Sequence, residues 1–160
     1  MKHLWLILWI FVLMATAADA VPVIVVVRHA EKASAGGNDP ELSVAGQKRA
    51  DALVRILKDS QITAVFVTEF KRTQQTASPT ARVAHVSPTV VPAADIPGLV
   101  AKLRALNGNA LVVGHGNTIP DLMKALGIAT SVTVPEDDYT EIFLVSLSDP
   151  SQLLRLHYPF

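Results

Sequence analysis

The chain has 160 residues, half of them hydrophobic, which is enough for one globular domain with a substantial core. Its 14 basic and 14 acidic residues balance, so it lacks the basic field that nucleic-acid-binding proteins use, and we expect no nucleic-acid partner. The absence of cysteine excludes a disulfide framework and a lipid-modified cysteine.

The first 20 residues have the layout of a secretory signal peptide. Lys2 and His3 precede an apolar run over 4–14, and small residues follow up to the A-x-A cleavage site that ends at Ala20. An uncleaved membrane anchor is the alternative, but the segment is shorter than the roughly 20 apolar residues that span a bilayer. We therefore expect a signal peptide over 1–20, one domain over 21–160 and a periplasmic or secreted location. Membrane contact is expected only through an uncleaved signal segment.

The chain after the signal segment alternates predicted strands and helices. A run of mostly β-branched residues over 23–27 predicts a buried strand, and the Gly- and Pro-containing stretch 33–40 predicts a loop. Ser43 is the expected N-cap of a helix that extends to about Lys58. A second buried strand is predicted over 62–67.

The second half continues this alternation. A helix is expected from about Lys71, with an interruption at Pro79 where Ser78 caps a new start. The further elements are expected to be a short strand over 89–91, a helix over 97–106, a buried strand over 110–113, a helix over 119–126 and two strands over 141–147 and 153–158. This order predicts an α/β three-layer sandwich, with a mostly parallel central sheet and helices on both faces.

Three predicted strands run directly into cationic or imidazole side chains. The first ends at Arg28-His29, the second is followed by Arg72 in the first turn of the next helix, and the third leads into His115 between two glycines. Since adjacent parallel strands bring their carboxyl ends together, we expect these four side chains to meet in one crevice. Two guanidiniums and two imidazoles suit a phosphoryl group.

These motifs resemble those of the histidine phosphatase superfamily, also called phosphoglycerate-mutase-like. The resemblance is carried by the R-H-A-E-K opening that starts at Arg28, the L-S-x-x-G segment over 42–46, the T-E-F-K-R-T-x-x-T-A block over 68–77 and the V-G-H-G-N sequence over 113–117. The matches occur in family order and extend from about 23 to 126. The chain thus looks like a small, exported, bacterial-type member with the phosphoglycerate-mutase-like fold.

The resemblance implies a role for each of the four residues. His29 takes the position of the nucleophile that becomes phosphohistidine, Arg28 and Arg72 match the arginines that hold the non-bridging oxygens, and His115 matches the second histidine, which donates to those oxygens. No metal or cofactor is implied, since these groups supply the positive charge. Asn117 either hydrogen-bonds a substrate in the site or caps the next helix.

Many members of this superfamily also use a carboxylic acid, between the second arginine and the last histidine, that protonates the leaving oxygen. Asp95 is the single acidic residue in that interval and is our first candidate for this general acid, with Glu69 and Glu31 as other candidates. If no acid serves, the enzyme would favour leaving groups that need little protonation, such as a phosphorylated imidazole or an acyl phosphate.

The sequence therefore predicts an exported, metal-independent phosphoric monoester hydrolase that acts on a small phosphorylated substrate or on a phosphorylated glycan or lipid headgroup. A non-catalytic phosphate- or phospholigand-binding protein that uses the same pocket is the alternative. A third hypothesis, a metal site of His29, His115 and Glu31, has suitable ligands for zinc, but two central arginines would repel a cation. The rim of the pocket is expected from the loops 33–40, 93–97 and 130–139.

Overall fold

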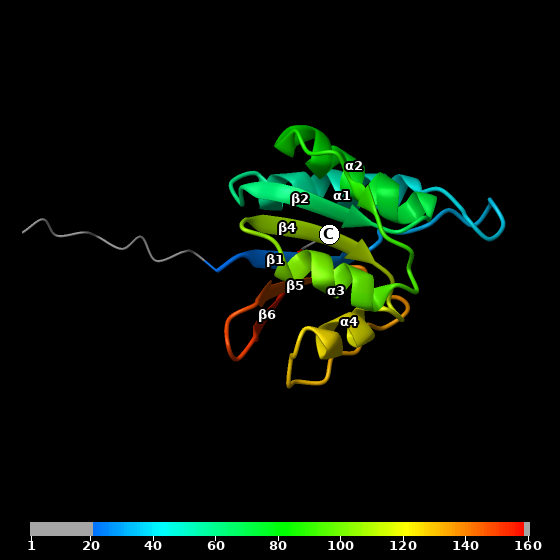
Figure 1. Ribbon diagram of the computed structural model, residues 1–160. Coiled ribbons are helices and arrows are strands. Elements are labelled where there is room, and N and C mark those ends of the chain that lie inside the picture. Colours follow the sequence, from blue (N-terminus) through cyan, green and yellow to red (C-terminus); the bar gives the residue numbers. More distant parts are fainter. Residues whose placement is uncertain (1–20, 159–160) are drawn as a thin grey trace, which may run out of the picture.

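A six-stranded sheet forms the centre of the computed structural model, which describes residues 21–158 (Figure 1). The strands lie in the order β3-β2-β4-β1-β5-β6. Neighbouring strands are parallel from β3 to β1, and β5 and β6 continue the sheet in antiparallel pairing. Their bounds are β1 Val23–Arg28, β2 Ile62–Val67, β3 Thr89–Val90, β4 Asn109–Gly114, β5 Glu141–Ser146 and β6 Gln152–His157.

Helices cover both faces of this sheet, which confirms the predicted three-layer α/β class. The helices are α1 Val44–Leu57, α2 Lys71–Ala84, α3 Ile96–Arg104 and α4 Ile119–Ala125. Helices α1 and α2 lie on one side of the sheet, and α3 and α4 lie on the other (Figure 1). Leu53 of α1 and Ala77 of α2 pack with Val25 and Val27 of β1. Leu103 of α3 and Met123 of α4 belong to the core cluster on the opposite face. Because β1 is buried on both faces, it reads as a continuous apolar run instead of an alternating one.

The strand register aligns the ends of β1 and β4, and this alignment positions the polar residues that follow. Val27 pairs with Val113 and Arg28 with Gly114. The next residue, His29, donates its backbone N–H to the carbonyl oxygen of Gly114 at 2.9 Å. The two sequence segments that carry the histidines therefore leave the sheet side by side, although they are more than 80 residues apart in the chain.

Most predicted elements are confirmed within one or two residues at their ends. Ser43 caps α1 as expected, since its Oγ accepts a hydrogen bond from Gly46 N at 3.1 Å. The expected interruption at Pro79 is wrong, because α2 continues through it and Ser78 caps no new helix. Proline removes one helical hydrogen bond, but the flanking Ala77 and Ala81 are buried against the sheet, and this packing holds the helix together.

The predicted signal segment lies outside the described residues, as do residues 159–160. Within 21–158, no helix is both long enough and apolar enough to span a membrane.

Candidate active site

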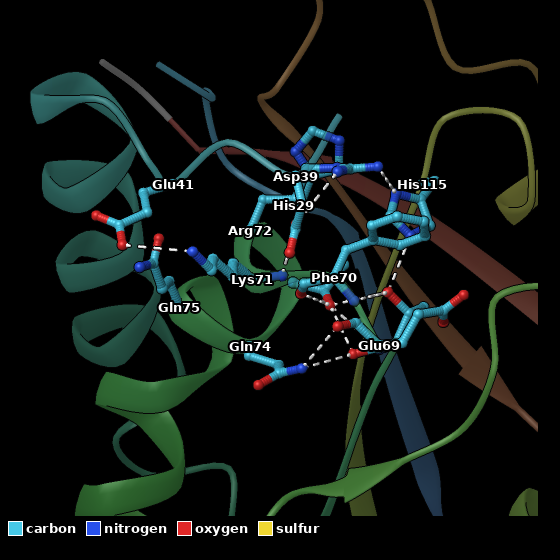
Figure 2. A network of polar contacts seen from close by, with 12 residues as sticks. His29, Asp39, Glu41, Glu69, Phe70, Lys71, Arg72, Gln74, Gln75 and His115 are labelled. Carbon is cyan, nitrogen blue, oxygen red and sulfur yellow. Dashed lines mark hydrogen bonds and ion pairs between the residues drawn. The ribbon is translucent and has the colours of Figure 1, made fainter. Parts of the chain in front are cut away.

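Arg28, His29, Arg72 and His115 meet at the carboxyl ends of β1, β2 and β4, as the sequence predicts. The rings of His29 and His115 lie edge to face, with their centroids 5.4 Å apart. Nη2 of Arg72 lies 3.5 Å from Nδ1 of His115 (Figure 2). Both imidazoles are only 5% exposed, whereas the two arginines are partly exposed.

One ring nitrogen of His29 is hydrogen-bonded to the backbone, and the other is available for chemistry. Nδ1 lies 2.8 Å from the carbonyl oxygen of Ala30, which can only accept, so Nδ1 carries the proton and Nε2 keeps its lone pair. Burial lowers the pKa of His29 to about 4; the bond to Ala30 opposes this shift, and the nearby His115, Arg72 and Arg28 add to it. The ring is therefore neutral and nucleophilic at neutral pH.

A threonine links the backbone beside His29 to α2. Thr76 Oγ1 accepts a hydrogen bond from Ala30 N at 2.9 Å and donates to the carbonyl oxygen of Arg72 at 2.7 Å. The segment that carries His29 is thus tied to the helix turn that carries Arg72. The four-residue spacing between Arg72 and Thr76 in the second motif therefore contributes to the geometry of the site.

A threonine hydroxyl group contacts one ring nitrogen of His115. Its Nε2 lies 3.0 Å from Thr68 Oγ1, and its Nδ1 faces Arg72. Burial, together with the charges of Arg72 and Arg28, lowers the pKa of His115 to about 4, although the carboxylate of Glu69 opposes this shift. His115 is therefore also neutral in the unliganded protein at neutral pH.

Each arginine of the site lies against an aromatic ring. The guanidinium carbon of Arg28 is 4.2 Å from the centre of the Tyr139 ring. That of Arg72 is 4.3 Å from the centre of the Phe70 ring, and Figure 2 shows both of these residues. Such stacking holds a planar guanidinium in place while its N–H edge stays available for an anion. The sequence did not lead us to predict a role for either ring. Phe70 lies inside the T-E-F-K-R block, and this position was a usable signal. For Tyr139, the sequence offers no signal beyond its place in the loop 130–139.

Arg28 also organises the loop that precedes Tyr139. Its Nη1 donates to the carbonyl oxygens of Pro135, Glu136 and Asp138 at 2.6–3.2 Å. Its buried Nε has no hydrogen-bond partner among the described residues. One end of the guanidinium therefore holds the rim, and the other leaves a donor that an anionic ligand could satisfy.

The three carboxylates considered as acids all have other partners. Asp95 caps α3, since its Oδ1 accepts from Gly98 N at 2.9 Å, and Glu69 Oε2 accepts from Ala93 N at 2.8 Å. Glu31 forms a salt bridge with the buried Arg49. These carboxylates make no hydrogen bond or ion pair with the four site residues within the part of the chain that the structure describes.

A fourth carboxylate, which the sequence analysis assigned only to a turn, lies at the mouth of the site. Asp39 Oδ1 is 3.9 Å from Nη1 of Arg72 and accepts a hydrogen bond from Lys71 N at 3.0 Å (Figure 2). It therefore connects the loop 33–40 to the start of α2. Its signal was the Asp-Pro dipeptide, which has no fixed relation to a site 30 residues later.

Within residues 21–158, the structure shows no polar contact between the four residues and the remaining predicted site residue, Asn117. Asn117 is exposed in the turn after His115, and Thr118 is the N-cap residue of α4. Because Glu31 is held by Arg49, the zinc ligand set considered for His29, His115 and Glu31 is not assembled. The arrangement suits a tetrahedral anion, since donors converge on a space bounded by a nucleophilic nitrogen.

Comparison with known proteins found a family model and solved structures that are similar to this chain. The model of the histidine phosphatase superfamily (branch 1) matches residues 24–95. The structure of the protein histidine phosphatase SixA complexed with tungstate is similar at 22% identity and a TM-score of 0.70, covering 84% of this chain and 96% of that one. Mycobacterial glucosyl-3-phosphoglycerate phosphatase is similar at 16% identity and a TM-score of 0.66, covering 86% and 98%. None of the curated protein sequences matches this chain.

Proposed function

We propose that this chain is a phosphatase of the histidine phosphatase superfamily that acts through phosphohistidine on His29; the family model and the solved structures support this proposal. The observation that carries this proposal is the state of the His29 ring. Its Nδ1 is bonded to a backbone carbonyl, so the lone pair is on Nε2, and the ring is close enough to Arg28, Arg72 and His115 for their charges to lower its pKa. A neutral imidazole needs no base to become a nucleophile.

The proposed reaction has two displacements. In the first, Nε2 of His29 attacks phosphorus, the P–N bond forms, and the bond to the leaving group breaks with its electron pair. In the second, water attacks phosphorus, the P–N bond breaks, and phosphate leaves while the water proton passes to the product or to solvent. Arg28, Arg72 and His115 stabilise the charge on the non-bridging oxygens in both steps.

The leaving group receives little help from the protein in this mechanism. Asp95, our first candidate for the general acid, caps the N-terminus of α3 through its carboxylate. We therefore favour substrates whose leaving group needs little protonation, such as a phosphorylated imidazole or an acyl phosphate, over simple alkyl esters of glycans or lipids. The structural similarity to a protein histidine phosphatase supports this substrate class.

The N-terminal pattern supports export of this activity to the periplasm or the medium. A mature N-terminus at Val21, found by sequencing the protein recovered from that compartment, would establish cleavage after Ala20. A start at Met1 in a membrane fraction would contradict it.

Turnover of acetyl phosphate and of p-nitrophenyl phosphate, each with the wild type and with His29→Ala, tests the proposed function. We expect acetyl phosphate to be the better substrate, and His29→Ala to abolish both activities while the fold is retained. Acid-labile radiolabel on His29 should appear in rapidly quenched wild type. Binding of phosphate without label or turnover would favour the phospholigand-binding alternative.

Asp95→Asn separates the two accounts of the leaving group. Asparagine caps a helix about as well as aspartate, so the fold should be unchanged. We expect turnover of both substrates within a factor of about 2, whereas loss of a general acid would reduce ester hydrolysis by roughly 100-fold or more. The larger loss would restore Asp95 as the acid.

A further inference from the structure

A chain of buried hydroxyl groups extends from His115 to a backbone carbonyl. His115 Nε2 lies 3.0 Å from Thr68 Oγ1, which lies 2.9 Å from Thr73 Oγ1, which donates to the carbonyl oxygen of Phe70 at 2.8 Å. The three residues whose side chains form this hydrogen-bonded row, His115, Thr68 and Thr73, are each less than 9% exposed. Water therefore has little access to them, and the protons must be shared among these atoms.

The direction of the hydrogen bond between His115 and Thr68 follows from Arg72. A guanidinium can only donate, and Nη2 of Arg72 lies 3.5 Å from Nδ1 of His115, so a neutral ring accepts there and carries its proton on Nε2. Thr68 Oγ1 then accepts from Nε2. Either threonine hydroxyl group can supply the proton between the two oxygens, and Thr68 supplies it when Thr73 donates to the carbonyl oxygen of Phe70.

His115 must therefore donate to Thr68 from Nε2. The neutral ring then has its lone pair on Nδ1, the nitrogen that faces Nη2 of Arg72 at 3.5 Å. A lone pair opposite a guanidinium donor is the consistent arrangement, and a proton on Nδ1 would face another proton. In the unliganded protein, Nδ1, the ring nitrogen of His115 that faces Arg72, is thus an acceptor.

We propose that Thr68 is a positioning residue that holds the His115 proton on Nε2, so that His115 takes up a second proton, on Nδ1, when a phosphoryl dianion binds. The proposal rests on the proposed function, because it assumes that the anion occupies this site. Bound to Nδ1, the new proton forms the hydrogen bond to a non-bridging oxygen. It comes from solvent when the ligand is a dianion and from the ligand itself when the ligand is a monoanion.

The charges around His115 explain why binding would trigger this uptake. Arg72 from α2 and Arg28 from β1 oppose a positive imidazole at His115, whereas the carboxylate of Glu69 favours one. The neutral ring of His29 lies beside it, with the ring centroids 5.4 Å apart. Burial and the two arginines keep the pKa of the unliganded ring at about 4. A dianion placed between these groups reverses the local field and favours the imidazolium.

Calorimetry of inorganic phosphate binding in buffers with different ionisation heats measures the proton uptake. We expect uptake of about one proton per phosphate near pH 8 and close to none near pH 6, where the ligand carries the proton. The same measurement on His29→Ala should show the same uptake, which excludes protonation of His29. Nitrogen-15 NMR of the unliganded protein should show His115 protonated on Nε2.

Two variants of Thr68 distinguish positioning from a structural role. In Thr68→Val the ring loses its acceptor and is free to carry its proton on Nδ1, so phosphate should bind with proton uptake reduced by at least half. Thr68→Ser should restore the wild-type uptake. Thr80→Val is the matched control, because Thr80 is a buried hydroxyl of α2 without a partner among the described residues.

Each outcome decides the proposal. Failure of wild-type protein to bind phosphate would overturn both this proposal and the proposed function. Binding without proton uptake near pH 8, or a neutral His115 protonated on Nδ1, would overturn this proposal alone. If Thr68→Val does not fold, the NMR measurement on the wild type still decides it.

Discussion

Acidification should destabilise this protein through its two buried imidazoles. The pKa of His29 and of His115 is lowered from 6.5 to about 4 by burial and by neighbouring positive charge. Between these values the unfolded chain binds protons that the folded protein does not. The stability that the neutral rings contribute is therefore fully present when the pH is above 6.5, the pKa of histidine in the unfolded chain. It is lost as the pH falls toward about 4, the pKa of the two rings in the folded protein.

The size of this effect follows from the two pKa values. Between about pH 7.5 and about pH 4.5, the difference costs roughly 2.5 kcal/mol for each imidazole, or about 5 kcal/mol for both. That is a large part of the stability of a typical domain. Carboxylates that titrate near pH 4 add to the slope, so the contribution of one imidazole is best obtained as a difference between variants.

Urea unfolding of wild type, His29→Asn and His85→Asn at several pH values measures that difference. The free energy of unfolding of His29→Asn should fall by roughly 2.5 kcal/mol less than that of wild type over this range. His85→Asn is the matched control, since His85 is exposed at the C-cap of α2, where its φ of 56° also suits asparagine. Equal slopes for all three proteins would refute the reasoning, because His29 could then not be buried in its neutral form.

Two further substitutions test particular contacts. Arg72→Lys removes the planar edge that faces His115 and should lower kcat/KM roughly 10- to 100-fold, whereas Lys71→Ala, which removes an exposed neighbouring charge, should change it little. Steady-state kinetics would contradict this if both variants behaved alike. Gly46→Ala places a Cβ against the carbonyl oxygen of Glu31, and this clash should cost about 1–3 kcal/mol of stability and reduce activity, because the segment after β1 that contains Glu31 also carries the nucleophile His29. Gly37→Ala, with a φ of 63° but no neighbour within 4 Å, should affect stability only; chemical unfolding and turnover together would show if it does not.

Local sequence predicted the layers of the fold because each element has its own pattern. The apolar run of β1 and the Ser43 cap of α1 depend on residues within a few positions of each other, and both are confirmed. Pro79 shows where this reasoning fails. Local rules predict a break, but the burial of Ala77 and Ala81 comes from segments elsewhere in the chain, and it outweighs one lost hydrogen bond.

By itself, the sequence determined that Arg28, His29, Arg72 and His115 would meet, because parallel strands place their carboxyl ends at one edge and each residue follows such an end. Only the tertiary structure decided how these groups are held. The use of Asp95 as a helix cap, the binding of Arg28 Nη1 to the loop before Tyr139 and the proton chain through Thr68 all depend on hydrogen-bond directions. Such directions depend on the approach of distant segments to within a fraction of an ångström, which spacing along the chain does not encode.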